Sequence, residues 1–276
     1  MNGLVNIIVM TSEFVHLDGT RVEERILGVG GTGLVIQQGL FAVKIPRLSR
    51  DLTSEGEVVR DESAPSRYGD YDIRADRIKS IEDEVAIYER LGRHDNIVCC
   101  DSGHPSQRSL QMTLMQNGDL RHYFENHAAG RDLQLKWFTM MANAVVHTHS
   151  RRIIIADLRL DNFLLDEYLN VKLGDFGEST LMPLEWDLTG PDNLGFSVLT
   201  DLGQLGAVIY EIVTGEAFKF DIFQSWETTG HTSVWPSRDS LPTLENVWLG
   251  EIIEKCWTAG YQSAKDMLAD LAMMKA

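Results

Sequence analysis

The sequence IIIADLRLDNFLLDEYLNVKLGDFG, residues 153–177, decides the fold prediction. Two short apolar runs, residues 163–165 and 171–173, flank a turn rich in Asp, Glu and Asn, and this pattern predicts a β-hairpin. A hairpin brings its two ends together, so we expect Asn162 and Asp175 to lie on the same side. Their oxygens are of the hard kind that Mg²⁺ prefers when it is also bound to phosphates. Asp157 lies on the entering loop, where a carboxylate could accept a proton from a hydroxyl.

A glycine-rich stretch lies towards the N-terminus, where residues 25–46 read RILGVGGTGLVIQQGLFAVKIP. Gly28, Gly30 and Gly33 have the G-x-G-x-x-G spacing. The runs on both sides are strand-like, whereas a dinucleotide-binding fold would have a helix after the glycines. We therefore expect a turn between antiparallel strands, whose backbone N–H groups can lie over phosphates without obstruction by side chains.

A lysine follows in the next predicted strand, residues 41–45, where Lys44 interrupts an apolar run. A buried ammonium needs an anion nearby, and the alternative is an exposed lysine at a sheet edge. Apolar residues then recur at helical spacing over residues 81–91, with Gly92 as a plausible helix end. Glu84 lies on the apolar face of this helix, where a carboxylate needs a cation, and Lys44 is the candidate. Glu82 is the alternative acid on this helix.

The length of 276 residues suits one large domain or two small lobes. A net charge of -16 argues against nucleic acid and anionic membranes as partners and favours basic ones, although it could simply keep the chain soluble. Three cysteines, two of them adjacent, fit a reducing compartment, so we expect the cytoplasm or the nucleus. Residues 1–20 are expected to be an N-terminal extension, and the polar residues 47–80 an insertion or flexible loop.

The segments DLRLDN and DFG resemble the catalytic and metal-binding segments of protein kinases. The resemblance runs from about residue 25 to residue 271. It implies an α+β, bilobal protein-kinase-like fold with ATP between the lobes. The N-lobe, about residues 21–115, would be a small β-sheet plus one helix, and the C-lobe, about residues 116–276, would be larger and mainly helical.

The resemblance also implies roles for particular residues. Asp157, Arg159 and Asn162 would act in catalysis, and Asn162 and Asp175 would also hold Mg²⁺. The family pattern Glu-x-x-Ile-Tyr selects Glu84 over Glu82 as the partner of Lys44. The residues implied in binding ATP are Gly28, Gly30, Gly33, Val35, Ala42, Lys44, Glu84, Thr113, Met115 and Leu164. Thr113 and Met115 belong to the segment whose backbone would hydrogen-bond the adenine.

The sequence departs from the kinase pattern at the catalytic loop, where Ile155 and Ala156 stand in place of His and Arg. The missing arginine would grip an activation-loop phosphate, so we expect no control by such phosphorylation. This departure resembles the non-RD branch of the family, and the string DLRLDNFLLD is similar to that of divergent kinases in filamentous fungi. The segment Gly190-Pro191-Asp192 stands where protein kinases have Ala-Pro-Glu, so Asp192 takes the place of the glutamate.

Three further polar residues have structural or functional interpretations. Asp201 opens an apolar helix that ends at Gly215, and it could cap that helix, hold the catalytic-loop backbone as in kinases, or do both. His147 and His149 are interpreted as helix-end histidines, since no Cys or other His is spaced to complete a zinc site.

The predicted function is transfer of the γ-phosphoryl of Mg·ATP to a protein hydroxyl, on Ser or Thr, with a basic protein as substrate. The alternative is a pseudokinase scaffold that binds nucleotide or partners without catalysis, which Ile155 and Ala156 favour. A third class, phosphorylation of a small molecule, agrees less well with DFG and the apolar helix that follows. The sequence carries no indication of oligomeric state.

Overall fold

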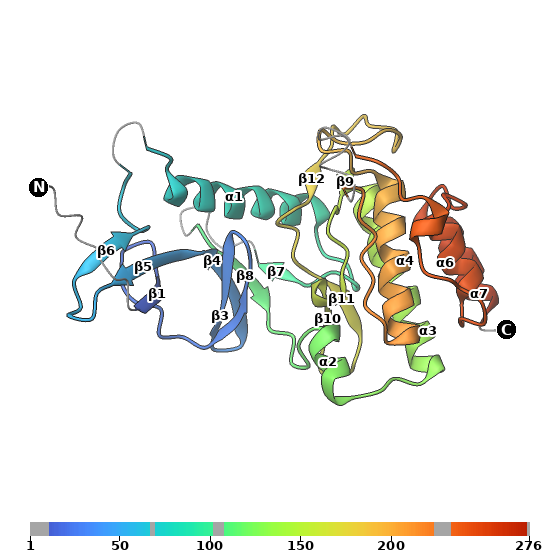
Figure 1. Cartoon of the computed structure of the whole chain (residues 1–276), viewed down its shortest axis with the longest axis horizontal. Helices are drawn as coiled ribbons and strands as arrows, with labels where there is room; N and C mark the ends of the chain where they lie inside the picture. Colours follow the sequence, from blue (N-terminus) through green and yellow to red (C-terminus); the bar gives the residue numbers. More distant parts are fainter. Residues whose placement is uncertain (1–10, 67–69, 102–107, 224–232, 275–276) are drawn as a thin grey trace, which may run out of the picture. The chain divides into compact units, whose positions relative to one another are not determined.

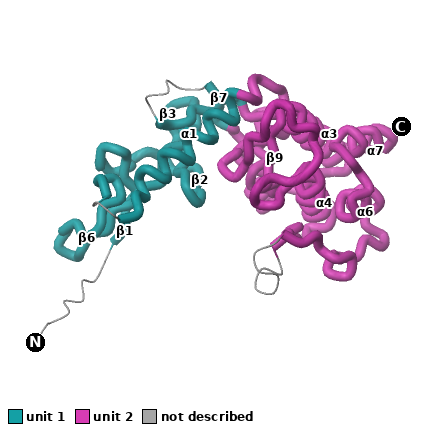
Figure 2. Tube along the Cα trace, turned by 90° about the horizontal axis from the view of Figure 1, so that it is seen from above, with its two compact units in different colours: residues 1–89, 99–114 teal, residues 90–98, 115–276 magenta. Residues whose placement is uncertain are grey.

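The computed structural model describes residues 11–66, 70–101, 108–223 and 233–274 (Figure 1). The chain divides into two compact units, unit 1 with residues 1–89 and 99–114, and unit 2 with residues 90–98 and 115–276 (Figure 2). The boundary therefore differs from the predicted lobes, since residues 11–20 belong to unit 1 and residues 90–98 to unit 2.

Unit 1 contains a five-stranded sheet with strand order β2-β3-β4-β8-β7. Its strands are β2 (Ile26–Val29), β3 (Gly33–Gln38), β4 (Phe41–Pro46), β7 (Cys100–Asp101) and β8 (Leu110–Thr113). Alternate residues of β3 and β4 face the core, where Leu34 is opposite Ile45 and Ile36 is opposite Val43. The antiparallel pairing of β2, β3 and β4 places the glycine-rich turn between β2 and β3, as the sequence predicts.

A second sheet in unit 1 has the order β1-β5-β6, with β1 (Thr11–Val15), β5 (Leu48–Leu52) and β6 (Val58–Asp61). Val15 and Leu48 are register partners and are fully buried, and Glu13 forms an ion pair with its partner Arg50. Because residues 48–52 and 58–61 are strands, the alternative of a flexible loop over residues 47–80 is wrong, whereas the alternative of a polar insertion stays a prediction. Residues 11–15 are also a strand of this unit. Cross-strand ion pairs hold strands that contain few apolar residues, so hydrophobic periodicity does not reveal them.

Helix α1 (Ile73–Leu91) follows the second sheet. The sequence predicts a helix at this place but starts it at Ile81, because the first two turns are strongly charged and lack an apolar face. The Asp72 carboxylate accepts a hydrogen bond from the N–H of Ala75 at 2.9 Å, as a capping side chain does. Beyond the last turn, Gly92 has a φ of 64°, a left-handed conformation that suits glycine after a helix.

Unit 2 is mainly helical, and its helices are α2 (Leu120–Asn126), α3 (Arg131–Ser150), α4 (Val198–Thr214), α6 (Gly250–Trp257) and α7 (Ala264–Met273). Its strands and 3₁₀ turns are β9 (Ile153–Ile154), η2 (Leu160–Asn162), β10 (Phe163–Leu165), β11 (Val171–Leu173), β12 (Thr180–Leu181) and η3 (Arg238–Ser240). Helix α3 packs against α7, and α4 packs against α6. With a β-rich first part and a helical second part, the predicted α+β fold class is confirmed.

Helix α4 is the buried element that positions the site of unit 2. Ser197 caps it, and the side chains and backbone of Ser197 and Thr200 form a capping box. Asp201 is therefore not the cap, which excludes one of its two predicted roles. A Cβ on Gly206 would lie 2.6 Å from Cβ of Cys256 on α6, so the close approach of the two helices requires glycine there.

The predicted hairpin is formed by β10 and β11, which pair antiparallel with Phe163 opposite Leu173. In its turn the Asp166 carboxylate accepts hydrogen bonds from the N–H groups of Tyr168 and Asn170, both at 2.9 Å, and from the Asn170 amide at 3.0 Å. These bonds satisfy the turn backbone locally, as Asp and Asn do in many tight turns.

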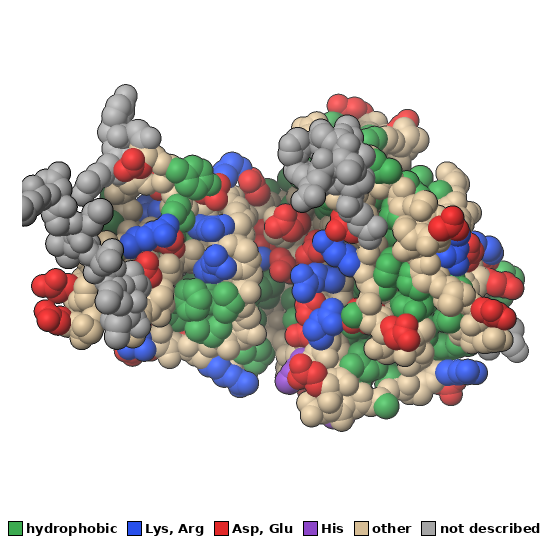
Figure 3. All heavy atoms as spheres, viewed as in Figure 1, with side chains coloured by type: hydrophobic (Ala, Val, Ile, Leu, Met, Phe, Trp, Pro, Cys, Tyr) green, Lys and Arg blue, Asp and Glu red, His purple; other side chains and the backbone are tan. Residues whose placement is uncertain are grey.

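Acidic and basic side chains are interspersed over both units on the face shown in Figure 3, so the net charge of -16 is not gathered into one block there. Among the residues that the structure describes, none of the helices combines the length and the apolar character needed to cross a bilayer.

Candidate active site

The glycine-rich turn connects β2 to β3 within unit 1. The N–H of Gly30 donates to the carbonyl of Gly33 at 2.9 Å, which closes the turn, and Gly28 lies opposite Val35 in the register of the two strands. A Cβ built on Gly31 would meet nothing within 4 Å, so the tip of the turn has open space around it. The backbone of this tip is therefore accessible to a ligand.

Lys44 of β4 and Glu84 of α1 form a buried ion pair. Nζ of Lys44 lies 2.7 Å from Oε2 of Glu84, and the two side chains are 7% and 1% exposed. Glu82 is exposed, so Glu84 is the residue that pairs with Lys44. The lysine stem also lies against Gly33, where a Cβ would be 2.5 Å from Cε of Lys44. Glycine at this position leaves room for the lysine.

We predict that Glu84→Gln destabilises unit 1, whereas Glu82→Gln has little effect. The amide can still accept a hydrogen bond from Lys44 but carries no charge, so we expect a loss of about 1.5–3 kcal/mol for Glu84→Gln and less than about 0.5 kcal/mol for the exposed control. All six tryptophans lie in unit 2, so tryptophan fluorescence does not report on the unfolding of unit 1. Unfolding is therefore followed by far-UV circular dichroism. Equal midpoints for the two variants would contradict the prediction.

The residues implied in adenine binding lie on strands and on the segment that follows them. Ala42 of β4 is buried and pairs with Met112 of β8. The Thr113 N–H donates to the carbonyl of Cys99 at 2.9 Å, so the carbonyl is the backbone group of Thr113 that a base could use.

Two residues implied in adenine binding belong to unit 2. The Met115 carbonyl accepts from the N–H of Gly118 at 3.2 Å, so the N–H is the backbone group of Met115 that a base could use. Leu164 lies on β10 and is half-buried, with its side chain next to Gly174, where a Cβ would be 2.9 Å from Cδ1 of Leu164.

Asp157, Asn162 and Asp175 come together in unit 2. Nδ2 of Asn162 donates to the carbonyl oxygen of Asp157 at 2.8 Å and to its carboxylate at 3.2 Å. Across the hairpin end, the N–H of Gly174 donates to the carbonyl of Asn162 at 2.9 Å, which places Asp175 next to this pair. Burial raises the pKa of the Asp157 carboxyl and the charge of Asp175 adds to the rise, whereas Arg159 and Asn162 oppose it.

The loop that carries Asp157 is fixed to α4 by Asp201. The carboxylate of Asp201 is completely buried and accepts from the N–H groups of Ile155 at 2.9 Å and Ala156 at 2.8 Å. It also lies 2.8 Å from Nε2 of His149 at the end of α3. His149, interpreted from the sequence as a helix-end histidine, is thus part of the support of the loop.

Gln204 is a second support, which the sequence does not reveal. It lies one turn after Asp201 on α4, accepts from the N–H of Leu158 at 3.0 Å and donates to the carbonyl of Ala156 at 2.6 Å. Ala156 has a φ of 67°, which is unfavourable for a residue other than glycine. Because Asp201 holds its N–H and Gln204 holds its carbonyl, the left-handed conformation is maintained.

Arg159 is exposed and pairs with Asp161, with Nη2 2.7 Å from the carboxylate. The other oxygen of Asp161 accepts from Arg121 of α2 at 2.8 Å, and Arg121 continues to Glu211 of α4 at 2.8 Å. Although burial opposes it, the hydrogen bonds from the two arginines lower the pKa of Asp161. The guanidinium of Arg159 is thus oriented by its own loop.

Asp192 organises the segment that follows DFG. Its carboxylate accepts from the hydroxyl of Thr180 at 2.8 Å and from the N–H groups of Leu194 and Phe196, both at 2.9 Å. The Gly190-Pro191-Asp192 motif therefore stabilises its own loop through neutral donors.

The donors near Asp157 fit a Mg²⁺ ion that is also bound to phosphate. Asn162 uses its amide nitrogen for the bonds to Asp157, so its side-chain amide oxygen is the atom that can bind a metal ion. The exposed side chain of Asp175 contributes a carboxylate. Over the described residues, no group of three or more His, Cys, Asp or Glu side chains could hold a metal ion by itself.

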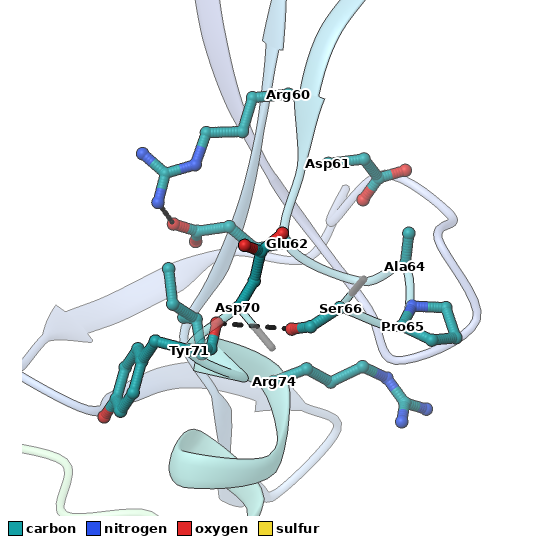
Figure 4. Close-up of a pocket in the computed structure, with 10 residues that line it drawn as sticks. Arg60, Asp61, Glu62, Ala64, Pro65, Ser66, Asp70, Tyr71 and Arg74 are labelled. Atoms are coloured by element: carbon teal, nitrogen blue, oxygen red, sulfur yellow. Dashed lines mark hydrogen bonds and ion pairs between the residues drawn. The ribbon is translucent and has the colours of Figure 1, made fainter. Parts of the chain in front are cut away.

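A separate hollow of about 250 Å³ lies in unit 1, where β6 leads into α1 (Figure 4). Its polar groups interact with each other, since Arg60 pairs with Glu62 at 3.0 Å and Ser66 donates to the Tyr71 carbonyl at 3.3 Å. None of the predicted site residues lines it.

Comparison with known proteins gives matches to protein kinases. CBL-interacting protein kinase 25 of Oryza sativa subsp. japonica is 32% identical over 121 residues, 41% of this chain and 23% of the relative. CBL-interacting protein kinase 33 of the same plant is 29% identical over 199 residues, 68% of this chain and 42% of the relative. The cell cycle serine/threonine-protein kinase CDC5/MSD2 of Saccharomyces cerevisiae is 26% identical over 158 residues, 50% of this chain and 22% of the relative.

These alignments span less than half the length of each relative. A protein-family model described as "Protein kinase domain" matches residues 22–190, more than half of the chain and all of the predicted site residues from Gly28 to Asp175. This match includes the glycine turn, the buried pair of Lys44 and Glu84, and the loop that carries Asp157. The chain therefore belongs to the protein kinase domain family.

Proposed function

We propose that the chain is an active protein kinase that transfers the γ-phosphoryl of Mg·ATP to a Ser or Thr hydroxyl of a protein. The observation that carries this proposal is the convergence of Asp157, Asn162 and Asp175, with Asn162 bonded to Asp157 through its amide nitrogen. Phosphoryl transfer needs positioning and charge neutralisation more than covalent chemistry, and these residue types supply both.

Asp157 orients the acceptor hydroxyl and takes its proton in this proposal. Its carboxylate is fixed on one side by Asn162, and its loop is fixed to α4 by Asp201 and Gln204. Because its pKa is raised, the Asp157 carboxylate is a stronger base for the proton that the acceptor hydroxyl releases.

The oxygens of Asn162 and Asp175 hold Mg²⁺, which neutralises phosphate charge when it is bound. Arg159, oriented by Asp161, adds a positive charge at the same loop. Arginine and lysine differ in shape, but either supplies a cation near the transferred group.

Residues of unit 1 bind the phosphates of the nucleotide in this proposal. Lys44, held by Glu84, contacts the phosphates, together with the glycine turn that carries Gly28, Gly30 and Gly33. The backbone groups identified above give the adenine one acceptor and one donor, Thr113 C=O and Met115 N–H. The apolar side chains proposed to contact the base are Val35 and Ala42 in unit 1 and Leu164 in unit 2.

Control by activation-loop phosphorylation is absent in this proposal. Ala156 has no side chain that could bind a phosphate, and the loop after DFG is held by the bonds of Asp192 to Thr180, Leu194 and Phe196. A segment that is stabilised without a phosphate needs none to become ordered.

The proposed acceptor is a basic protein, and the proposed compartment is the cytoplasm or the nucleus. The net charge of -16 attracts basic partners, and three free thiols fit a reducing environment. Ser/Thr specificity is supported by similarity to relatives whose names include serine/threonine-protein kinase.

A pseudokinase that binds nucleotide without transfer is the second candidate, favoured by Ile155 and Ala156 in the catalytic loop. The test is incubation of the full chain with γ-labelled Mg·ATP and a generic basic protein. We expect label on Ser or Thr of the protein. No label, with ATP still raising the melting temperature, would identify the pseudokinase, and label on a small molecule alone would overturn the protein substrate.

A further inference from the structure

A hydrogen bond links the glycine-rich turn to helix α1 within unit 1. The hydroxyl of Ser80 donates to the hydroxyl of Thr32 at 2.8 Å, although the two residues are 48 positions apart in the sequence. Thr32 lies in the turn between β2 and β3, and both side chains are half-buried. The turn is therefore attached to a helix that is distant in sequence.

Arg47, directly after β4, holds the other side of the turn. Its N–H donates to the carbonyl of Thr32 at 2.9 Å, and its guanidinium donates to the carbonyl of Gly30 at 2.8 Å. Residues 30–32 thus receive hydrogen bonds from two separate elements, the segment after β4 and helix α1.

Ser80 belongs to the same face of α1 as Glu84, one helical turn earlier. That face therefore contacts the site twice, since Ser80 reaches Thr32 and Glu84 reaches Lys44. The stem of Lys44 in turn lies against Gly33, next to Thr32. These contacts form a closed ring through α1, β4 and the glycine turn.

The turn needs such an attachment because four of the six residues in positions 28–33 are glycine. Glycine loses more conformational freedom on ordering than any other residue, and a loop that becomes ordered only on binding weakens the ligand's affinity. Val29 is exposed, whereas Thr32 offers a hydroxyl that reaches a partner outside the turn.

We propose that Thr32 and Ser80 are positioning residues of the nucleotide site. Their hydrogen bond fixes the glycine turn against the face of α1 that also carries Glu84, so the turn is already ordered when phosphates bind. This inference rests on the proposed function, since it concerns how the same site binds Mg·ATP. It adds to that function a link between the turn and α1, through which displacement of either element changes nucleotide affinity.

The test compares the dissociation constant for Mg·ATP, measured by titration calorimetry, in Thr32→Val, Thr32→Ser, Ser80→Ala and the double variant Thr32→Val with Ser80→Ala. Loss of either hydroxyl should weaken binding about three- to tenfold, the range expected for one hydrogen bond, and Thr32→Ser should bind like the wild type. The double variant should bind no more weakly than either single variant, because both changes remove the same bond. KM for ATP should rise with little change in kcat.

Hydrogen exchange of the nucleotide-free protein gives a readout that does not depend on activity. The amides of residues 30–33 should exchange faster in Thr32→Val and Ser80→Ala than in Thr32→Ser, while α4 in unit 2 exchanges as in the wild type. Unchanged exchange in α4 shows that unit 2 of each variant is folded, and unchanged exchange in β4 shows the same for unit 1.

Three results would overturn the inference. Thr32→Val could bind Mg·ATP as tightly as Thr32→Ser, the effects of the two single changes could add in the double variant, or loss of the bond could tighten binding. A wild type that binds no nucleotide would instead contradict the proposed function, and the exchange rates would still decide whether the bond orders the turn.

Discussion

Asp157→Asn should lower kcat by about 10³-fold, within the 10²–10⁴ that a positioned acid or base contributes, and should leave the affinity for Mg·ATP nearly unchanged. Asparagine has the same shape, and its carbonyl oxygen can accept the hydrogen bond from Asn162, so the loop keeps its support from Asp201. What is lost is the basic oxygen that, in the proposed function, takes the proton. A steady-state assay with a protein acceptor measures the effect.

The matched control is Asp239→Asn, an equal change of charge at an exposed position of η3. It should have the activity of the wild type. If Asp157→Asn lowered kcat by less than about tenfold, within the range of one ordinary hydrogen bond, Asp157 would not be the proton acceptor.

Asp201→Ala should destabilise unit 2 by about 3–5 kcal/mol, the range for removing one partner from a buried charged network. The N–H groups of Ile155 and Ala156 and the ring of His149 would each lose an acceptor in a place that water does not reach. Ala156 would also lose one of the two bonds that hold its left-handed conformation. Urea unfolding followed by tryptophan fluorescence reports on unit 2, which contains all six tryptophans.

Asp166→Ala is the control for burial. Asp166 also accepts three hydrogen bonds, but in a turn that water can reach, so its removal should destabilise unit 2 by only about 1 kcal/mol. Similar midpoints for Asp201→Ala and Asp166→Ala would show that the buried carboxylate does not hold the catalytic loop.

The sequence predicts those parts of the fold that depend on local patterns. The hairpin of β10 and β11 follows from two apolar runs around Asp166, and the glycine turn follows from strand-like flanks around Gly30. Helical periodicity places Glu84 on the apolar face, and the resemblance to kinases, through the pattern Glu-x-x-Ile-Tyr, selects it over Glu82; the structure confirms the choice, because Glu84 is the buried partner of Lys44.

The sequence does not predict parts held by polar contacts between distant residues. The sheet of β1, β5 and β6 is missed because ion pairs such as Glu13 with Arg50 take the place of an alternating apolar pattern. Gln204 and Ser80 are missed because their partners are 46 to 48 positions away. For Gln204 the available signal is a polar residue one turn after Asp201 in an otherwise apolar helix.

The departure at Ile155 and Ala156 has a structural explanation that does not depend on activity. Their N–H groups are held by Asp201, and the side chain of Ile155 is almost fully buried, so the loop keeps its conformation without the histidine and arginine of the kinase pattern. The loop that carries Asp157 therefore keeps its position without those side chains.

The most direct test of the account is transfer of labelled phosphate from Mg·ATP to the chain itself and to a basic protein, compared between the wild type and Asp175→Ala. The side chain of Asp175 is exposed, so its removal takes away one proposed Mg²⁺ ligand together with the hydrogen bond that it accepts from the N–H of Gly177 at 3.2 Å. Circular dichroism of the variant checks that it is folded. The account predicts label with the wild type and a loss of at least about 10²-fold with the variant. Equal labelling by both proteins, or none by a wild type that is folded and saturated with nucleotide, would contradict it.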